Sequence, residues 1–262
     1  MQTYLETAVR AARAAGAMQK DRLWSHHDIE FKGEINLVTE VDKACEALIV
    51  QTIRADFPDH DILAEENDYA AVGKPCKWII DPLDGTTNYA HGFPWFCVSI
   101  ALEMAGVVQL GVIYHPMMDE LFTAVKGEGA FLNGRRLSVS SRKPLKNCLL
   151  ATGFPYDRTW ENENNFANFT TFQMTARAVR RFGAAALDLA YVAAGRLDGY
   201  WECKLKPWDV AVGQLLVTEA GGRVTGHAGE PYSVYNHRIC ASNGHIHKEM
   251  EEVLVKTTLA PR

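Results

Sequence analysis

Two amphipathic helices are predicted near the start of the chain. Within residues 3–20, apolar residues recur at the spacing of one helix face, and Thr3 with Glu6 has the spacing of a capping box. Thr39 and Asp42 repeat that box before a second apolar stripe, which a proline ends. We expect the apolar face of the first helix to pack in the core.

Short apolar runs between positions 61 and 125 predict a sheet. Glycine and proline separate them, and they lie at residues 61–64, 77–80, 96–103, 107–114 and 120–125. Residues 104–106, between two of these runs, predict a hairpin, and residues 127–134 predict further tight turns. The first half is therefore predicted to contain two helices followed by a sheet.

In the second half, strand and helix patterns alternate after a polar stretch at residues 138–146. Strands are predicted at 148–152 and 197–202, and helices at 160–175, 184–194 and 210–220. Gly221 and Gly222 end the last of these helices. We expect an N-terminal α+β lobe at residues 1–140 and a C-terminal α/β lobe at residues 141–262, packed as one compact unit.

Composition is that of an ordered globular enzyme, with 47% hydrophobic and 23% charged residues in a chain of 262. The net charge of -5 offers no whole-protein attraction for nucleic acid or an anionic membrane. Apolar runs fall well short of the roughly 20 residues of a membrane helix, and Glu6, Arg10 and Arg13 interrupt the first segment. We expect neither a membrane span nor a signal peptide.

Six cysteines are scattered along the chain without a Cys-x-x-Cys pair, which favours free thiols in a reducing cytoplasm over zinc binding. His245 and His247 form an isolated His-x-His. Because no further ligand motif accompanies them, we expect surface histidines at the start of a helix.

The segment with most chemical content runs from Trp78 to Asn88, with the sequence WIIDPLDGTTN. An apolar strand leads into Asp81 and Asp84, and the intervening proline fixes a turn that lets the two acids converge. Gly85 and the threonines after it offer backbone N–H groups to a phosphate. Taken alone, Asp84-Gly85 is more simply explained as a turn, with Asp81 capping a helix.

Further acids stand at the ends of other predicted elements. Glu65 and Glu66 follow an apolar run, and Asp209 stands at the start of an apolar helix. Each alone indicates only a solvated turn or a first-turn charge. Two carboxylates about 4 Å apart repel by roughly 4 kcal/mol at an effective dielectric near 20, so a cluster needs protons or cations. Oxygen ligands of this kind favour Mg²⁺.

In combination and in this order, these segments resemble the inositol monophosphatase family over nearly the whole chain. The resemblance rests on residues 63–66 (LAEE), 78–88, 93–94 (FP), 98–100 (VSI), 208–209 (WD) and 219–222 (EAGG), and residues 183–190 resemble its bacterial branch. It implies a layered α-β-α-β-α sandwich of the inositol monophosphatase and fructose bisphosphatase type. It also implies a homodimer.

The resemblance implies a site for two or three Mg²⁺ ions. Their ligands would be Glu65, Asp81, the carbonyl of Leu83, Asp84 and Asp209. A water activated by the metal would attack the phosphate. Glu65 and Thr86 would accept or relay its proton, and Asp42 and Lys32 would support them.

Substrate contacts implied by the resemblance lie at Asp84, Gly85, Thr86, the backbone near Ala185, and Glu202. The acid at 202 stands seven residues before Asp209, as the substrate-contacting acid of the family does. An exposed strand end is the alternative explanation for it.

Inositol 1-phosphate is the leading substrate that the resemblance suggests, and lithium inhibition is implied with it. Fructose 1,6-bisphosphate, histidinol phosphate and adenosine bisphosphates stay open, because relatives with the same metal core hydrolyse them. The Asp-Gly-Thr-Thr-Asn form favours the inositol branch over the nucleotide branch. A role of another class, as a regulatory partner of RNA polymerase or RNA, also stays open, although the complete acid set argues against a purely non-catalytic protein.

Overall fold

The computed structural model describes residues 1–25, 29–32, 36–71 and 73–259. The helices described are α1 (Gln2–Arg22), α2 (Glu40–Asp56), α3 (Thr86–Ala90), α4 (Phe166–Thr175), α5 (Ala185–Ala193), α6 (Pro207–Glu219) and α7 (His247–Leu259). None of the helices in this part of the chain is long and apolar enough to cross a membrane.

The strands form two main sheets and a small antiparallel pair. The seven-stranded sheet has the order β3 (Asp61–Ala64), β4 (Cys76–Asp84), β5 (Cys97–Met104), β6 (Val107–His115), β7 (Glu120–Val125), β8 (Gly129–Leu132) and β9 (Arg135–Arg136). The five-stranded sheet has the order β11 (Ala178–Arg180), β10 (Leu149–Thr152), β12 (Gly199–Cys203), β14 (Arg238–Ser242) and β13 (Arg223–Thr225). The pair consists of β1 (Ile29–Lys32) and β2 (Asn36–Thr39).

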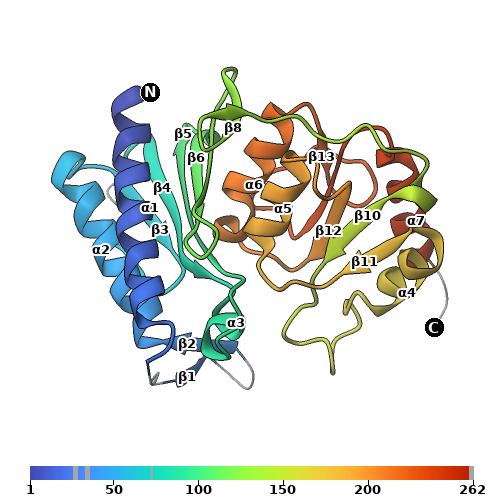
Figure 1. The fold of residues 1–262 in the computed structure, drawn as a ribbon, viewed down its shortest axis with the longest axis horizontal. Coiled ribbons are helices and arrows are strands. Elements are labelled where there is room, and N and C mark those ends of the chain that lie inside the picture. The colour runs from blue at the N-terminus through green and yellow to red at the C-terminus, as the bar shows by residue number, and fades with distance from the viewer. Residues whose placement is uncertain (26–28, 33–35, 72, 260–262) are drawn as a thin grey trace.

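Helices and sheets alternate as layers (Figure 1). Helices α1 and α2 cover one face of the seven-stranded sheet, α5 and α6 lie between the two sheets, and α4 and α7 cover the outer face of the five-stranded sheet. This arrangement confirms the expected α-β-α-β-α sandwich. The central helices are largely buried because both sheets pack against them, which explains their predominantly apolar sequences. The division of the chain into lobes at residue 140 stays a prediction.

The first sheet matches the sequence pattern closely. Strands β3 and β7 have the predicted bounds, and residues 105–106 make the predicted turn between β5 and β6. The tight turns expected at residues 127–134 enclose strand β8. Among the described strands of this sheet, β3 and β4 run parallel, and the other neighbours are antiparallel.

The two predicted capping boxes had different outcomes. At α2 the box is confirmed, because Thr39 and Asp42 exchange side-chain and backbone hydrogen bonds at the helix start. At α1 the box is wrong, because the helix begins at Gln2 with Met1 as its N-cap. The Leu5 amide already donates to the Met1 carbonyl at 3.1 Å, so Thr3 lies inside the first turn, where it cannot cap.

Helix α4 begins later than the asparagine-rich pattern indicated, at Phe166. The residue before it, Asn165, has a left-handed φ of 69° and is buried. Its side chain donates to the Gly153 carbonyl at 2.7 Å and accepts from Trp201 Nε1 at 2.8 Å. These tertiary contacts hold Asn165 out of the helical conformation, so residues 160–164 do not join the helix.

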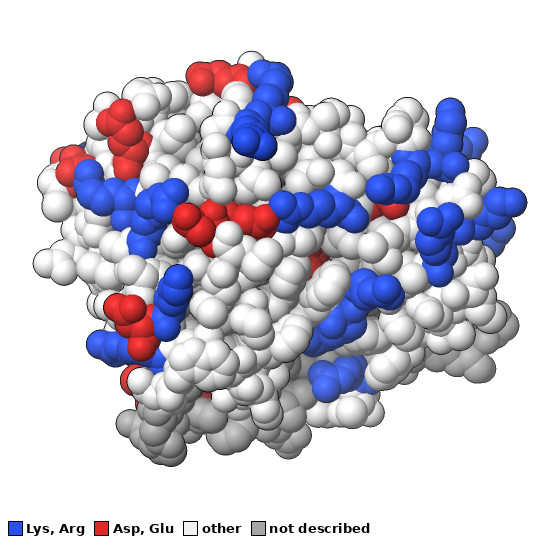
Figure 2. All heavy atoms as spheres, viewed as in Figure 1, with Lys and Arg blue, Asp and Glu red and all other residues white. Residues whose placement is uncertain are grey.

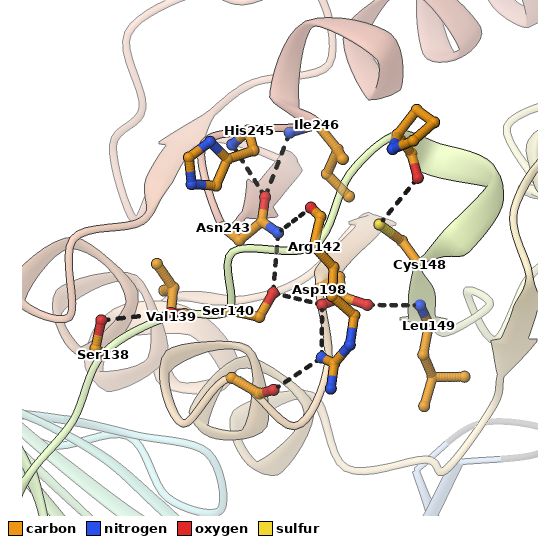
Figure 3. Close-up of polar contacts among 12 residues, drawn as sticks. Ser138, Val139, Ser140, Arg142, Cys148, Leu149, Asp198, Asn243, His245 and Ile246 are labelled. Atoms are coloured by element: carbon orange, nitrogen blue, oxygen red, sulfur yellow. Dashed lines mark hydrogen bonds and ion pairs between the residues drawn. The ribbon is translucent and has the colours of Figure 1, made fainter.

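The polar stretch between the two sheets is held in place by a buried carboxylate (Figure 3). Asp198 is fully buried and accepts hydrogen bonds from Ser140 Oγ at 2.5 Å, Arg142 Nη1 at 3.1 Å and the Leu149 backbone at 2.7 Å. Asn243 adds a hydrogen bond to Ser140 Oγ at 2.9 Å. The stretch therefore links β9 to β10 as an ordered segment, although its sequence is polar.

His247 begins α7 as expected but is buried, so its predicted surface position is wrong. Its Nδ1 lies 2.8 Å from Ser242 Oγ, and its Nε2 lies 2.9 Å from Thr225 Oγ1. Two strands of the second sheet thus supply polar partners that make burial of the imidazole favourable.

Candidate active site

A bulge in β4 brings Asp81 and Asp84 to the same side of the strand. Asp81 pairs with Ser99 and Asp84 pairs with Cys97, so three steps along β4 match two steps along β5. In a regular strand, residues three apart point to opposite faces, and one extra residue cancels that alternation. The sequence predicted this convergence but assigned it to a turn at Pro82, whereas β4 continues through Asp84 and a bulge causes it.

Gly85 follows the bulge at a position that only glycine fits easily. Its φ is 98°, and a Cβ built there would lie 2.9 Å from the Trp95 carbonyl oxygen. Helix α3 begins at the next residue, Thr86. Whether the amide groups of this turn bind phosphate stays a prediction.

Asp209 reaches the same region from the other half of the chain. It stands in the first turn of α6, behind Pro207, and one of its oxygens accepts the Lys206 backbone N–H at 2.6 Å. Asp84 is tied to the same layer of helices, because the Ala186 backbone N–H at the start of α5 donates to it at 2.7 Å. The central helices therefore hold two of the predicted ligands.

Glu202 lies on β12 and is buried, so it is not an exposed strand end. Tyr200 donates a hydrogen bond to its carboxylate. Gly153 makes room for that carboxylate, since a Cβ at this glycine would lie 2.2 Å from Glu202 Oε1.

A cavity of about 460 Å³ joins most of these groups. Of the predicted site residues, it is lined by Glu65, Asp81, Leu83, Asp84, Gly85, Thr86, Glu202 and Asp209. Ala185 lines an adjoining hollow of about 110 Å³, which shares Asp84, Glu202 and Asp209 with the larger one. Lys32 is the last residue of β1, and its side chain lies outside the described part of the chain.

Burial raises the pKa of four acids that line the cavity, Asp81, Asp84, Glu202 and Asp209. Burial raises the pKa of Asp81 well above its usual value, and the charges of Glu65, Asp84 and Asp209 raise it further. The pKa of Asp84 rises to about 7 and that of Asp209 to about 8, again chiefly through burial. The pKa of Glu202 rises to about 7, because burial outweighs its bond to Tyr200 and the charge of Arg181. Ionising all of these acids together is therefore unfavourable.

Thr86 connects the cavity to a carboxylate behind it. Its hydroxyl lies 2.9 Å from Asp42 Oδ1 and 3.2 Å from the Leu83 carbonyl oxygen, and it can donate to either. Asp42 is buried and also accepts from the Thr39 backbone at 2.9 Å. The capping acid of α2 therefore orients a hydroxyl of the cavity wall.

Several lining residues were missed by sequence reasoning. They are the cations Arg181, Lys204 and Lys206, the aromatic residues Phe154 and Tyr156, and Asp157. Lys204 has a left-handed φ of 62° and pairs with Asp157 at 2.6 Å, which joins two loops at the cavity wall. Asp188, buried on α5, lines the smaller hollow. No local pattern marks these residues, because they come together only through the packing of the two halves.

The donor set fits a hard divalent cation. In the described residues, no three His, Cys, Asp or Glu side chains stand grouped as a metal site. The chemistry nevertheless agrees with Mg²⁺, because the cavity offers carboxylate and carbonyl oxygens. Asp81, Asp84 and Asp209 each fix one oxygen on a backbone N–H. Burial, with repulsion from neighbouring acids, raises their pKa values, and bound cations would offset both effects.

Comparison with known proteins matches this architecture. The model of the inositol monophosphatase family matches residues 1–259. The chain is 46% identical over 260 residues to the inositol-1-monophosphatase of Synechocystis sp., across 98% of this chain and 90% of that protein. It is 44% identical over 247 residues to Nus factor SuhB of Pasteurella multocida, across 92% of each.

A solved structure agrees at the level of the fold. The inositol monophosphatase of Anabaena (Nostoc) sp. PCC 7120 superposes with a TM-score of 0.89 at 46% identity, covering 97% of this chain and 96% of that one. Its similarity extends over both sheets and the helices between them. The chain belongs to the inositol monophosphatase family and is a phosphatase.

Proposed function

We propose that this enzyme hydrolyses a small phosphorylated polyol with the help of Mg²⁺, and that its preferred substrate is inositol 1-phosphate. The observation that carries the proposal is the set of buried acids around one cavity, whose charges need cations for balance. A volume of about 460 Å³ suits one small ligand. The name of the Synechocystis relative supports inositol as the alcohol.

The proposed metal ligands are Glu65, Asp81, the Leu83 carbonyl, Asp84 and Asp209. Bound Mg²⁺ would polarise the phosphate and lower the pKa of water, which supplies the nucleophile. The protein's own part is to hold the phosphate beside Thr86 and to receive the proton of the attacking water. The Thr86 hydroxyl, hydrogen-bonded to Asp42 Oδ1 at 2.9 Å, is suited to pass that proton inward.

Recognition of the polyol is proposed to fall to Glu202 and Asp84, which both line the cavity. One oxygen of Glu202 is held by Tyr200, so the carboxylate is oriented before a ligand arrives. A carboxylate fixed in this way accepts hydrogen bonds from vicinal hydroxyls with little loss of entropy. Ala185 would contribute backbone contacts from the adjoining hollow.

Phosphate release from a substrate panel tests the proposal. Inositol 1-phosphate, fructose 1,6-bisphosphate, histidinol phosphate and adenosine 3′,5′-bisphosphate are each supplied with Mg²⁺ or with EDTA. Release that needs Mg²⁺ and is fastest with inositol 1-phosphate is the expected result. Faster release from another of these phosphates would assign the enzyme to the branch of the family that hydrolyses it. Release that does not need Mg²⁺ would contradict the proposed metal site. Inhibition by Li⁺ and a homodimer are further expectations.

A second candidate is a regulatory role in the cytoplasm, in contact with RNA polymerase or RNA. The Nus factor name of the Pasteurella relative favours it. Figure 2 also shows Lys and Arg gathered over the half of this face that holds the second sheet, where an acidic partner would bind. Complementation of a deletion strain by a folded Asp81→Asn protein distinguishes the roles, since full rescue without catalysis would favour the regulatory one.

A further inference from the structure

Glu46 is a buried acid outside the cavity that contacts the chain next to a proposed metal ligand. It lies on α2, one turn after Asp42, and its side chain is fully buried. It accepts three hydrogen bonds, from the Glu66 backbone N–H at 2.8 Å, Asn67 Nδ2 at 2.8 Å and the Tyr69 hydroxyl at 3.0 Å. All three donors belong to the loop that follows β3.

These contacts tie a single loop to a rigid helix. A buried carboxylate is unfavourable without partners, so the helix and the loop stabilise each other through Glu46. Helix α2 is 17 residues long, and its apolar face packs in a hydrophobic core shared with α1 and β4, which makes it a firm support. The loop has no regular structure of its own between residues 65 and 71.

The anchored loop begins with Glu65. The Glu66 amide bound by Glu46 is the next peptide group along the chain, so this bond limits the positions that Glu65 can adopt. Ala64, at the end of β3, pairs with Ile80 on β4, and Asp81 follows directly. Fixing Glu65 therefore also fixes its place beside Asp81.

The same face of α2 supports the other side of the cavity. Asp42 and Glu46 are four residues apart and so share a helix face. Asp42 binds Thr86 Oγ1 at the start of α3, whereas Glu46 binds the loop after β3. One helix thus braces two separate segments of the candidate site.

We infer that Glu46 is a positioning residue, which sets the metal affinity of the site by holding the Glu65 loop against α2. The inference rests on the proposed Mg²⁺ function and adds a residue to it. Replacing the carboxylate of Glu46 by an amide keeps its size but turns one oxygen into a donor. In either orientation, the NH₂ group of the new amide faces an N–H or O–H donor of the loop and cannot accept its hydrogen bond.

Calorimetric Mg²⁺ titration of EDTA-treated protein and hydrogen exchange at residues 65–70 form the test. For Glu46→Gln we expect Mg²⁺ affinity 10–100-fold weaker and faster exchange in this loop, with kcat at saturating Mg²⁺ within a few-fold of wild type. Glu103→Gln is the matched control. Glu103 is also buried and accepts hydrogen bonds from Lys77 Nζ at 3.2 Å and the Tyr235 hydroxyl at 2.9 Å. It lies away from the proposed ligands, because it is four residues along β5 from Ser99, which pairs with Asp81.

Each result has a defined meaning. Mg²⁺ affinity in Glu46→Gln equal to that of the control overturns the inference and leaves the proposed function intact. If the wild-type protein binds no Mg²⁺, the proposed function is overturned. If hydrogen exchange at residues 65–70 is unchanged in Glu46→Gln, this result alone overturns the idea that Glu46 holds the loop. If Glu46→Gln does not fold, Tyr69→Phe and Asn67→Ala each remove one of the bonds, and wild-type Mg²⁺ affinity in both would equally overturn the inference.

Discussion

The Thr86 hydroxyl lies 2.9 Å from the Asp42 carboxylate, although 44 residues separate them in the chain. Asp42 belongs to the capping box of α2, and Thr86 begins α3. Burial raises the pKa of Asp42, which makes its carboxylate a better proton acceptor. The capping acid of α2 thereby also holds a hydroxyl group of the cavity wall.

Thr86→Val is expected to lower kcat by about 10²–10⁴, because it deletes the hydroxyl and keeps the branched shape. KM should change little. Steady-state kinetics with inositol 1-phosphate at saturating Mg²⁺ checks this. Thr52→Val, which removes a hydroxyl bonded to the Leu48 carbonyl on α2, serves as the control and should keep wild-type rates. Equal kcat in Thr86→Val and wild type would exclude a part for the hydroxyl in proton transfer.

Asp81→Asn is expected to have opposite effects on stability and activity. The substitution removes a buried charge that three neighbouring acids repel, so Tm in EDTA should rise by about 3 °C. The Leu83 N–H keeps an acceptor at this position. Mg²⁺ should raise the Tm of wild type but not of the variant, and activity should be lost. A thermal scan with and without Mg²⁺ decides the matter, and an Mg²⁺-dependent shift in the variant would contradict the assignment of Asp81.

His115 is expected to make the protein sensitive to acid. It is fully buried, and burial lowers its pKa from 6.5 to about 4. Because the unfolded chain binds a proton near pH 6.5 and the folded chain only near pH 4, folding stability falls as pH decreases between these values. The loss amounts to about 3 kcal/mol when the folded pKa is reached.

His115→Phe removes this titration, and its ring can keep the edge contact with Trp95. Urea unfolding at pH 7.5, 5.5 and 4.5 should therefore show a smaller decrease in stability for the variant than for wild type. Parallel pH curves for the two proteins would show that His115 is not the responsible group.

Gly85→Ala should destabilise the fold more than a glycine substitution that costs conformation alone. Gly85 has a φ of 98° and its Cβ would meet the Trp95 carbonyl at 2.9 Å, whereas Gly106 has a φ of 79° with no atom within 4 Å of its Cβ. We expect about 1 kcal/mol of destabilisation for Gly106→Ala and about 2–3 kcal/mol for Gly85→Ala. Urea denaturation measures both. Equal losses would mean that the chain moves away from the new methyl group at little cost.

Local sequence patterns predicted much of the fold. Short apolar runs separated by glycine and proline defined β3 and β7, and the box of Thr39 and Asp42 marked the start of α2. Both signals arise from residues close together in the chain, so they depend little on tertiary packing. The start of α4 was missed because Asn165 is held by Gly153 and Trp201, which are distant in sequence.

The sequence by itself determined the order of the acids and the kind of ligand they suit. Pro82 between Asp81 and Asp84 allowed the prediction that the two acids converge, and oxygen donors favour a hard cation whatever surrounds them. The resemblance already grouped Asp209 with these acids, but only the tertiary structure supplied the cavity that joins them, the hydrogen bond from Thr86 to Asp42, and the contacts of Glu46 with the loop after Glu65. The physical reason is that these pairings join segments far apart in the chain, whose approach depends on the packing of whole layers and leaves no local periodicity to detect.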